Sequence, residues 1–156
     1  MGAVDIANWS VDWAWSVPLI VISVVIHVFG LGLITEQVDS ILSKLTDRRR
    51  FTSIFALVMS VTVTAAIILH AIEAAAWAAA YQALDALPNN KSAMLYSLSA
   101  MTSYGSSGTA LPDKWRMMGA LEALNGMLLF GLTTAFLFAI IQRVRPIGRR
   151  RMDRHP

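Results

Sequence analysis

The sequence predicts an all-α membrane protein with three membrane-spanning helices and a short re-entrant helix and loop between the second and the third. Of the 156 residues, 56% are hydrophobic and 15% are charged, whereas soluble domains are nearer half apolar and a quarter charged. Three apolar stretches each reach the roughly 20 residues that cross a hydrocarbon core. The polar, uncharged stretch SAMTSYGSSGTAL at 99–111 separates the second apolar stretch from the third.

The three apolar stretches contain few charged residues. The first, Trp15–Ile34, has none, and the second, Ile54–Tyr81, has only Glu73. The third, Gly119–Ile141, carries Glu122 near its start. So few charges over such lengths favour membrane spans. The chain has no cysteine, which excludes disulfides, thiolate metal sites and a cysteine nucleophile.

Basic residues give the expected orientation. They cluster in the loop between the first two spans and in the tail, at Lys44, Arg48, Arg49, Arg50, Arg143, Arg145, Arg149, Arg150, Arg151 and Arg154. The positive-inside rule puts this loop and the tail in the cytoplasm, so we expect the N-terminus and the segment after the second span outside. The tail is expected to contact anionic lipid head groups. Because no aromatic residue interleaves with its arginines, we do not expect it to bind nucleic acid.

Aromatic residues are expected to mark the outer ends of two spans. Trp9, Trp13 and Trp15 stand at the start of the first span, and Trp77 and Tyr81 stand at the end of the second. Tryptophan and tyrosine gather where the bilayer meets water. We therefore expect both groups to lie in an interfacial belt.

The segment between the second and third spans predicts a re-entrant loop. Pro88–Asn90 favours a turn, Lys91–Met101 favours a short helix with Ser92 as candidate N-cap, and Thr102–Gly108 is polar and irregular. A helix of about ten residues is too short to cross the bilayer. Irregular backbone at membrane depth is tolerated only where protein buries it or where it lines a water-filled cavity. Several copies around an axis would bring their carbonyls together, and a ring of carbonyls replaces the water around a cation.

The stretch AMLYSLSAMTSYGSSGTALPDKWRMMGALEALNGMLLFG resembles the pore loop and inner helix of the potassium-channel superfamily. It is similar to small bacterial members in which a T-T-x-G-Y-G-D filter is followed by L-P-x-x-W-R-L-x-G-x-x-E-A-x-N-G. The similarity covers Ala93 to about Arg143, and Leu69–Tyr81 in the second span is also similar. The resemblance implies a homotetramer in the bacterial inner (plasma) membrane, with one central pore lined by the third span and K⁺ as permeant ion.

The resemblance also locates the selectivity filter. Anchored without a gap on Leu111, Pro112 and Trp115, the family pattern overlays Thr102, Ser103, Tyr104, Gly105, Ser106, Ser107 and Gly108. The monovalent cation, K⁺ or in a relaxed filter Na⁺, is expected at Thr102, Ser103, Tyr104 and Gly105. In a second register Tyr104-Gly105 pairs with the family's Y-G, but that register loses the first glycine and needs a gap further on.

The filter departs from the family pattern in its outer half. The family's tyrosine, second glycine and aspartate become Ser106, Ser107 and Gly108. Ser107 would need a positive φ, which serine resists, and the outer mouth loses a charge. We therefore expect fewer ordered ion sites and weaker discrimination between K⁺ and Na⁺. The alternative is a non-conducting, channel-like scaffold or accessory subunit.

Other polar and small residues in the spans have two interpretations each. Gly126 and Gly131 are candidate hinges of a gate, or sites of close helix packing. His70, Glu73, Glu122 and Asn125 are expected to brace the pore loop. Alternatively, His70 and Glu73, which share a helix face, form a proton or divalent-cation sensor. His27, alone in the first span, is expected to be a packed or interfacial histidine, and Thr133 and Thr134 are candidates to face the cavity.

The predicted organisation follows. It comprises an extracytoplasmic N-terminus at 1–14, spans at 15–34, 54–81 and 119–141, a cytoplasmic loop at 35–53, a pore helix and filter loop at 82–118 and a basic cytoplasmic tail at 142–156. The predicted function is passive cation conduction without a cofactor other than the permeant ion. No enzyme motif is present, so no catalytic residue is predicted.

Overall fold

The structure, a computed structural model, describes residues 3–44, 51–104, 108 and 110–152, and among these the side chains of 9–43, 52–104, 108 and 110–144. All of its elements in this part of the chain are helices: α1 (Ala3–Lys44), α2 (Phe51–Ala83), α3 (Asn90–Met101), the short 3₁₀ helix η2 (Asp113–Trp115) and α4 (Arg116–Met152). This confirms the all-α class.

Three of these helices are long and apolar enough to cross a membrane. The segments that qualify are Trp9–Ser43 in α1, Thr52–Ala83 in α2 and Asp113–Val144, which contains η2 and most of α4. They extend beyond the apolar stretches picked out by composition, since a helix continues through its polar flanks after leaving the hydrocarbon. The length and apolarity of these three helices indicate an integral membrane protein.

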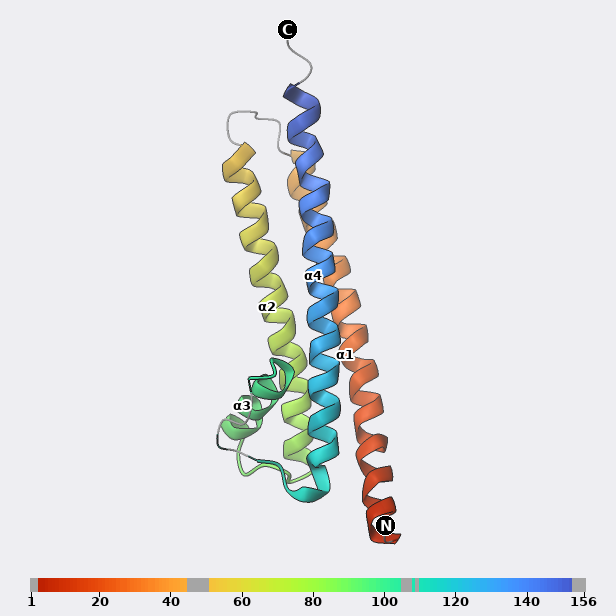
Figure 1. The fold of residues 1–156 in the computed structure, drawn as a ribbon. Helices are drawn as coiled ribbons and strands as arrows, with labels where there is room; N and C mark the ends of the chain where they lie inside the picture. The colour runs from red at the N-terminus through yellow and green to blue at the C-terminus, as the bar shows by residue number, and fades with distance from the viewer. Residues whose placement is uncertain (1–2, 45–50, 105–107, 109, 153–156) are drawn as a thin grey trace.

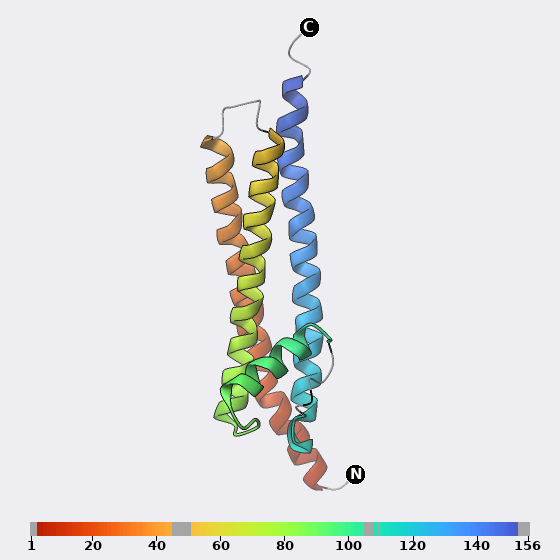
Figure 2. The same cartoon turned by 90° about the vertical axis from the view of Figure 1, so that its left-hand side faces the viewer.

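The three long helices lie side by side, and α3 lies at one end of them (Figures 1 and 2). The N-terminus lies at the end near α3, and the C-terminus lies at the opposite end. From the end of the bundle where α2 ends, α3 runs obliquely towards the middle of the bundle, and η2 and the start of α4 lie back at that same end (Figure 2). The helix before α3 therefore ends, and the helix after it begins, at the same end of the bundle.

The start of α3 is determined by Asn89. This residue has extended backbone angles, and its side chain accepts a hydrogen bond of 2.8 Å from the backbone N–H of Ser92. Asn89 is thus the N-cap, since the N-cap side chain bonds an otherwise unpartnered amide of the first turn. The expectation that Ser92 caps the helix was wrong, because the chain becomes helical two residues earlier, at Asn90.

The core near α3 is aromatic. Trp77 and Tyr81 of α2 are fully buried and pack in one cluster with Leu111, Trp115 and Met118. The interfacial position expected for Trp77 and Tyr81 is therefore wrong: α1, α3 and α4 enclose this end of α2, and the Trp77 Nε1–H donates to Ser23 Oγ of α1 at 3.1 Å. The three tryptophans of α1 are different, since Trp9, Trp13 and Trp15 are 43–49% exposed.

A second apolar cluster holds the opposite end of the bundle. It is built on Val38 of α1, Val58 of α2 and Ile140 and Val144 of α4. Beside it, Arg143 Nη2 of α4 lies 2.9 Å from Asp39 Oδ2 of α1. The long helices are thus packed together at both ends.

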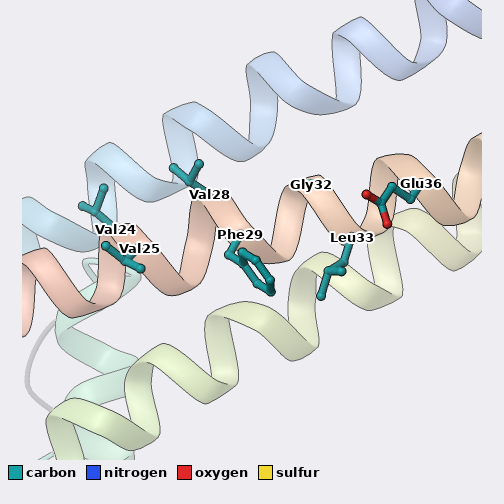
Figure 3. A pocket seen from close by; sticks show the side chains of 7 residues that line it. All are labelled: Val24, Val25, Val28, Phe29, Gly32, Leu33 and Glu36. Atoms are coloured by element: carbon teal, nitrogen blue, oxygen red, sulfur yellow. The ribbon is translucent and has the colours of Figure 1, made fainter.

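The outward face of α1 is apolar and carries a groove of about 540 Å³. Figure 3 shows its lining side chains, which all come from α1: Val24, Val25, Val28, Phe29, Gly32, Leu33 and Glu36. Phe29 is 69% exposed and Val25 is 61% exposed. Apolar side chains exposed in this way along a spanning helix are what lipid covers in a bilayer.

Candidate functional site

The C-terminal end of α3 is closed by its own backbone. After the C-cap Thr102, Ser103 takes the left-handed conformation at φ 55°. The Ser103 N–H donates to the Ala100 carbonyl at 3.1 Å, and the Tyr104 N–H donates to the Ser99 carbonyl at 3.0 Å. These two bonds form a Schellman motif, in which glycine is the usual residue at the left-handed position. Serine there is strained, because its Cβ crowds the backbone.

The predicted filter is partly described. Thr102, Ser103 and Tyr104 follow directly from α3, and the Tyr104 side chain is 83% exposed. Gly108 has a φ of 81°, which glycine adopts readily. Gly105, Ser106 and Ser107 lie outside the described residues, so the positive φ expected at Ser107 stays a prediction.

Glu122 of α4 connects the pore-helix segment to the bundle. Its Oε2 accepts a hydrogen bond of 2.7 Å from the Tyr81 hydroxyl of α2, and its Oε1 is hydrogen-bonded to Ser97 Oγ of α3. The Ser97 hydroxyl also donates to the Ala74 carbonyl of α2 at 2.8 Å. Glu122 and Ser97 are both fully buried. This one carboxyl therefore joins α2, α3 and α4.

The hydrogens in this group can be counted. Three contacts need three hydrogens, namely Tyr81 to Glu122, Ser97 to Glu122 and Ser97 to Ala74. The two hydroxyls supply only two, because a serine or tyrosine hydroxyl carries one hydrogen. A Glu122 in the acid form supplies the third, and it also avoids an uncompensated charge in the apolar interior.

Gly126 of α4 lies against the last residue of α3. A Cβ at Gly126 would lie 2.5 Å from Met101 Cα and 2.6 Å from the Met101 carbonyl oxygen, so only glycine permits this approach. Around a Cβ placed at Gly131 there is no atom within 4 Å among the described residues. The close contact explains why Gly126 is glycine, while a hinge at Gly126 or Gly131 stays a prediction.

Asn125 is buried beside these residues at 2% exposure. Neither its side-chain oxygen nor its nitrogen has a hydrogen-bond partner among the described residues. Of the residues expected to brace the pore loop, Glu122 thus bonds directly to α3, whereas no bond from the Asn125 side chain to α3 is present in this part of the chain.

His70 and Glu73 take part in a different group, which joins α1, α2 and α4. His27 Nδ1 lies 2.8 Å from Glu73 Oε1, and His70 Nδ1 lies 3.1 Å from Glu73 Oε2. Thr133 Oγ1 lies 3.1 Å from His27 Nε2 and 3.0 Å from His70 Nε2. These four residues, called here the histidine centre, form a closed ring of contacts. Thr134 is not part of it, since its hydroxyl donates to the Phe130 carbonyl of its own helix at 2.9 Å.

The partners of two residues in the histidine centre, His27 and Thr133, were not predicted from the sequence. His27 is 46 positions from Glu73 in the chain, and Thr133 is 63 positions from His70. Pairings at such distances depend on how the helices pack. A signal was nevertheless present, because His27 is the one ionisable side chain in the apolar stretch Trp15–Ile34, and such residues usually have a partner inside the bundle.

Comparisons with protein-family models, with curated proteins and with solved structures found no match to this chain. The potassium-channel resemblance therefore rests on the residues of the pore-loop stretch alone and stays a prediction.

Proposed function

We propose that this chain is a passive cation channel of the potassium-channel type, in which four copies surround an axial pathway. Thr102–Gly108 is the filter, α4 lines the pore and α1 lies at the periphery. K⁺ and Na⁺ both permeate, because the outer half of the filter lacks the family's second glycine, tyrosine and aspartate. The basic tail is on the cytoplasmic side, and α3 enters from outside.

The observation that carries this proposal is the depth at which the polar stretch begins. Met101, the last residue of α3, packs on Gly126 of α4 and clusters with Ala74 and Leu129. Gly126 is seven residues beyond Gly119, where the apolar stretch of the third span begins, or about 10 Å along the helix axis at 1.5 Å per residue. That is about a third of a hydrocarbon core of roughly 30 Å.

Irregular polar backbone is unfavourable at this depth, because hydrocarbon offers it no hydrogen-bond partners. Thr102 and the residues after it carry hydroxyls and carbonyls but no charge. Backbone of this kind at membrane depth is found where protein encloses it or where it lines a water-filled path. Enclosure by three further copies provides both conditions, and the carbonyls then face an axis, as in a cation filter.

The buried supports favour the same function. Glu122, Ser97 and Tyr81 bind α3 to the bundle from behind, and the close contact at Gly126 holds its C-terminal end. A filter needs carbonyls that face the axis, so a support behind the loop is consistent with conduction through it.

The test is ion flux through the purified protein in liposomes under separate K⁺ and Na⁺ gradients. Wild type is expected to carry both ions, and Gly105→Ala, in the proposed filter, is expected to abolish both fluxes. Gly32→Ala is the matched control: it lies on the groove of α1, and a Cβ there meets no described atom within 4 Å. Absence of flux from protein shown to be tetrameric would overturn the proposal in favour of a channel-like scaffold.

A further inference from the structure

The histidine centre has more close polar contacts than hydrogens when both imidazoles are neutral. Its four contacts run from Glu73 to His27, from His27 to Thr133, from Thr133 to His70 and from His70 back to Glu73. Two neutral imidazoles carry one N–H each, the threonine hydroxyl carries one O–H, and an ionised carboxylate carries none. Three hydrogens are therefore shared among four contacts.

The contact without a hydrogen bond lies between His70 and Glu73. Glu73 Oε2 has no hydrogen-bond partner among the described residues, although His70 Nδ1 is 3.1 Å away. The other three contacts have hydrogen-bond geometry. Glu73 Oε2 is thus a buried oxygen without a hydrogen bond, 3.1 Å from a ring nitrogen, and a cation that lies next to both atoms would compensate it.

We infer that the histidine centre binds a divalent transition-metal ion of the Zn²⁺ class, with His27 Nδ1, His70 Nδ1 and the Glu73 carboxylate as ligands. One ligand atom from each residue lies within 4.8 Å of the others. Two ligand atoms about 2.05 Å from one zinc ion at the tetrahedral angle are roughly 3.3 Å apart. The nitrogen–oxygen distances of 2.8 and 3.1 Å need to open only slightly to admit an ion.

Thr133 completes the arrangement of hydrogens. With a metal on both Nδ1 atoms, each Nε2 carries the ring hydrogen, and both Nε2 atoms lie 3.0–3.1 Å from Thr133 Oγ1. A hydroxyl oxygen has two lone pairs and accepts both N–H groups. Ligating histidines usually donate their second N–H to a fixed acceptor in this way, which determines the tautomer and orients the ring.

The type and number of ligands select the ion. Two imidazoles and one carboxylate suit zinc and its neighbours in the transition series, whereas Ca²⁺ and Mg²⁺ prefer oxygen ligands alone. Zinc sites with three protein ligands keep a fourth position open. His70 is 25% exposed while His27 and Glu73 are 0% exposed, so the open position is on the His70 side. A metal there would join α1 to α2 directly, and it would join both to α4 through the hydrogen bonds to Thr133.

The first experiment measures metal bound to the full chain, purified in detergent without a histidine tag. Co²⁺ replaces Zn²⁺ as the spectroscopic probe, and the bound metal per chain is measured after dialysis. Wild type is expected to bind one ion per chain, with the visible absorption of tetrahedral nitrogen and oxygen coordination. His155→Gln is expected to bind equally well; it removes the one histidine of the chain outside the histidine centre. Wild type that binds no Co²⁺, Ni²⁺ or Zn²⁺ would overturn the inference.

Variants then assign the ligands. His70→Gln and Glu73→Gln are each expected to weaken Co²⁺ binding by more than about 100-fold, and Thr133→Val by about 10–100-fold, because it removes only the acceptor of the two N–H groups. Binding that neither ligand variant changes would also overturn the inference. If a variant fails to fold, as judged by its helical circular dichroism, wild type and His155→Gln still decide the question. Metal binding and ion flux are measured separately. A protein that binds no metal would contradict the metal site but not the channel proposal, and a protein without ion flux would contradict the channel proposal but not the metal site.

Discussion

Glu73 and Glu122 are both fully buried carboxyl groups in spanning helices, and both lie within 2.8 Å of polar groups on other helices. The partners of Glu122 are hydroxyls of Tyr81 and Ser97, and every contact has hydrogen-bond geometry. The partners of Glu73 are two imidazoles, and one of its oxygens has no hydrogen bond among the described residues. The chemistry of the partners, rather than burial, therefore distinguishes the two carboxyl groups.

Hydroxyls and imidazoles respond differently to a missing hydrogen. A hydroxyl can rotate and either donate or accept, so a single proton on Glu122 completes its network. An imidazole presents its lone pair in a fixed direction in the ring plane, as a metal ligand does. Glu122 therefore acts as a neutral brace of α3, and Glu73 acts as one ligand of a cation site.

The largest effect is expected from Glu122→Leu. This change removes the partner of two buried hydroxyls, and we expect it to lower the free energy of unfolding by about 3 kcal/mol. Glu122→Gln is the matched control: its carbonyl accepts from Tyr81 and its amide donates to Ser97, as the acid form does, so we expect a loss within about 1 kcal/mol. Unfolding in mixed detergent, followed by circular dichroism, measures both. A loss for Gln as large as for Leu would contradict a neutral Glu122.

The next effect is expected from Gly126→Ala. Its Cβ would come within 2.5 Å of Met101 Cα, so α3 must move away from α4, at a loss of about 2 kcal/mol. Gly131→Ala lies on the same helix, where a Cβ meets no described atom within 4 Å. We expect it to be neutral or stabilising by up to about 1 kcal/mol, because alanine favours helix over glycine. Equal losses in the same unfolding assay would show that α3 does not press on Gly126.

A smaller effect of the opposite sign is expected from Glu73→Gln in metal-free protein. The side-chain carbonyl of the introduced glutamine still accepts from His27, and its amide brings a hydrogen to the contact with His70 Nδ1, which has no hydrogen bond in the wild type. We expect the free energy of unfolding to stay the same or rise by about 1 kcal/mol, while metal binding is lost. A destabilisation like that of Glu122→Leu would mean that Glu73 and Glu122 are equivalent after all.

The smallest effect is expected from Asp39→Asn. Asp39 pairs with Arg143 at 2.9 Å, but both side chains are about half exposed. Exposed ion pairs contribute less than about 1 kcal/mol, and salt reduces this further. Asp39→Asn is also a control, because it removes a carboxylate that is not buried. Its free energy of unfolding is measured in the same assay at low and at high salt. A loss comparable with that of Glu122→Leu would show that the helix ends depend on this pair.

Composition and hydropathy were enough to predict the three spanning helices, because a bilayer imposes length and apolarity on any helix that crosses it. The same signals could not place Trp77 and Tyr81, since tryptophan and tyrosine fit both an interface and a core. A sign of their burial was available: Glu73, Trp77 and Tyr81 are four residues apart and share one helix face. That face carries the polar contacts to α1 and α4.

Only part of the candidate site could be predicted from the sequence. The brace role expected for Glu122 came from its place as an acid inside a span, and the structure bonds Glu122 to Ser97 of α3. The histidine centre could not be predicted, because it depends on the rotation of three helices relative to one another. The residues of the filter carry no hydrophobic periodicity, so their backbone angles, such as the positive φ of Ser103, follow from the way α3 ends.

Single-channel recording in a planar bilayer, with K⁺ on one side and Na⁺ on the other, tests cation conduction most directly. A tetrameric pore with a relaxed filter predicts unitary currents that reverse close to zero voltage, and Gly105→Ala removes them. Absence of unitary currents from folded, tetrameric protein would contradict conduction. Currents that reverse far from zero, as in a pore that excludes Na⁺, would contradict the relaxed selectivity inferred from Ser106, Ser107 and Gly108.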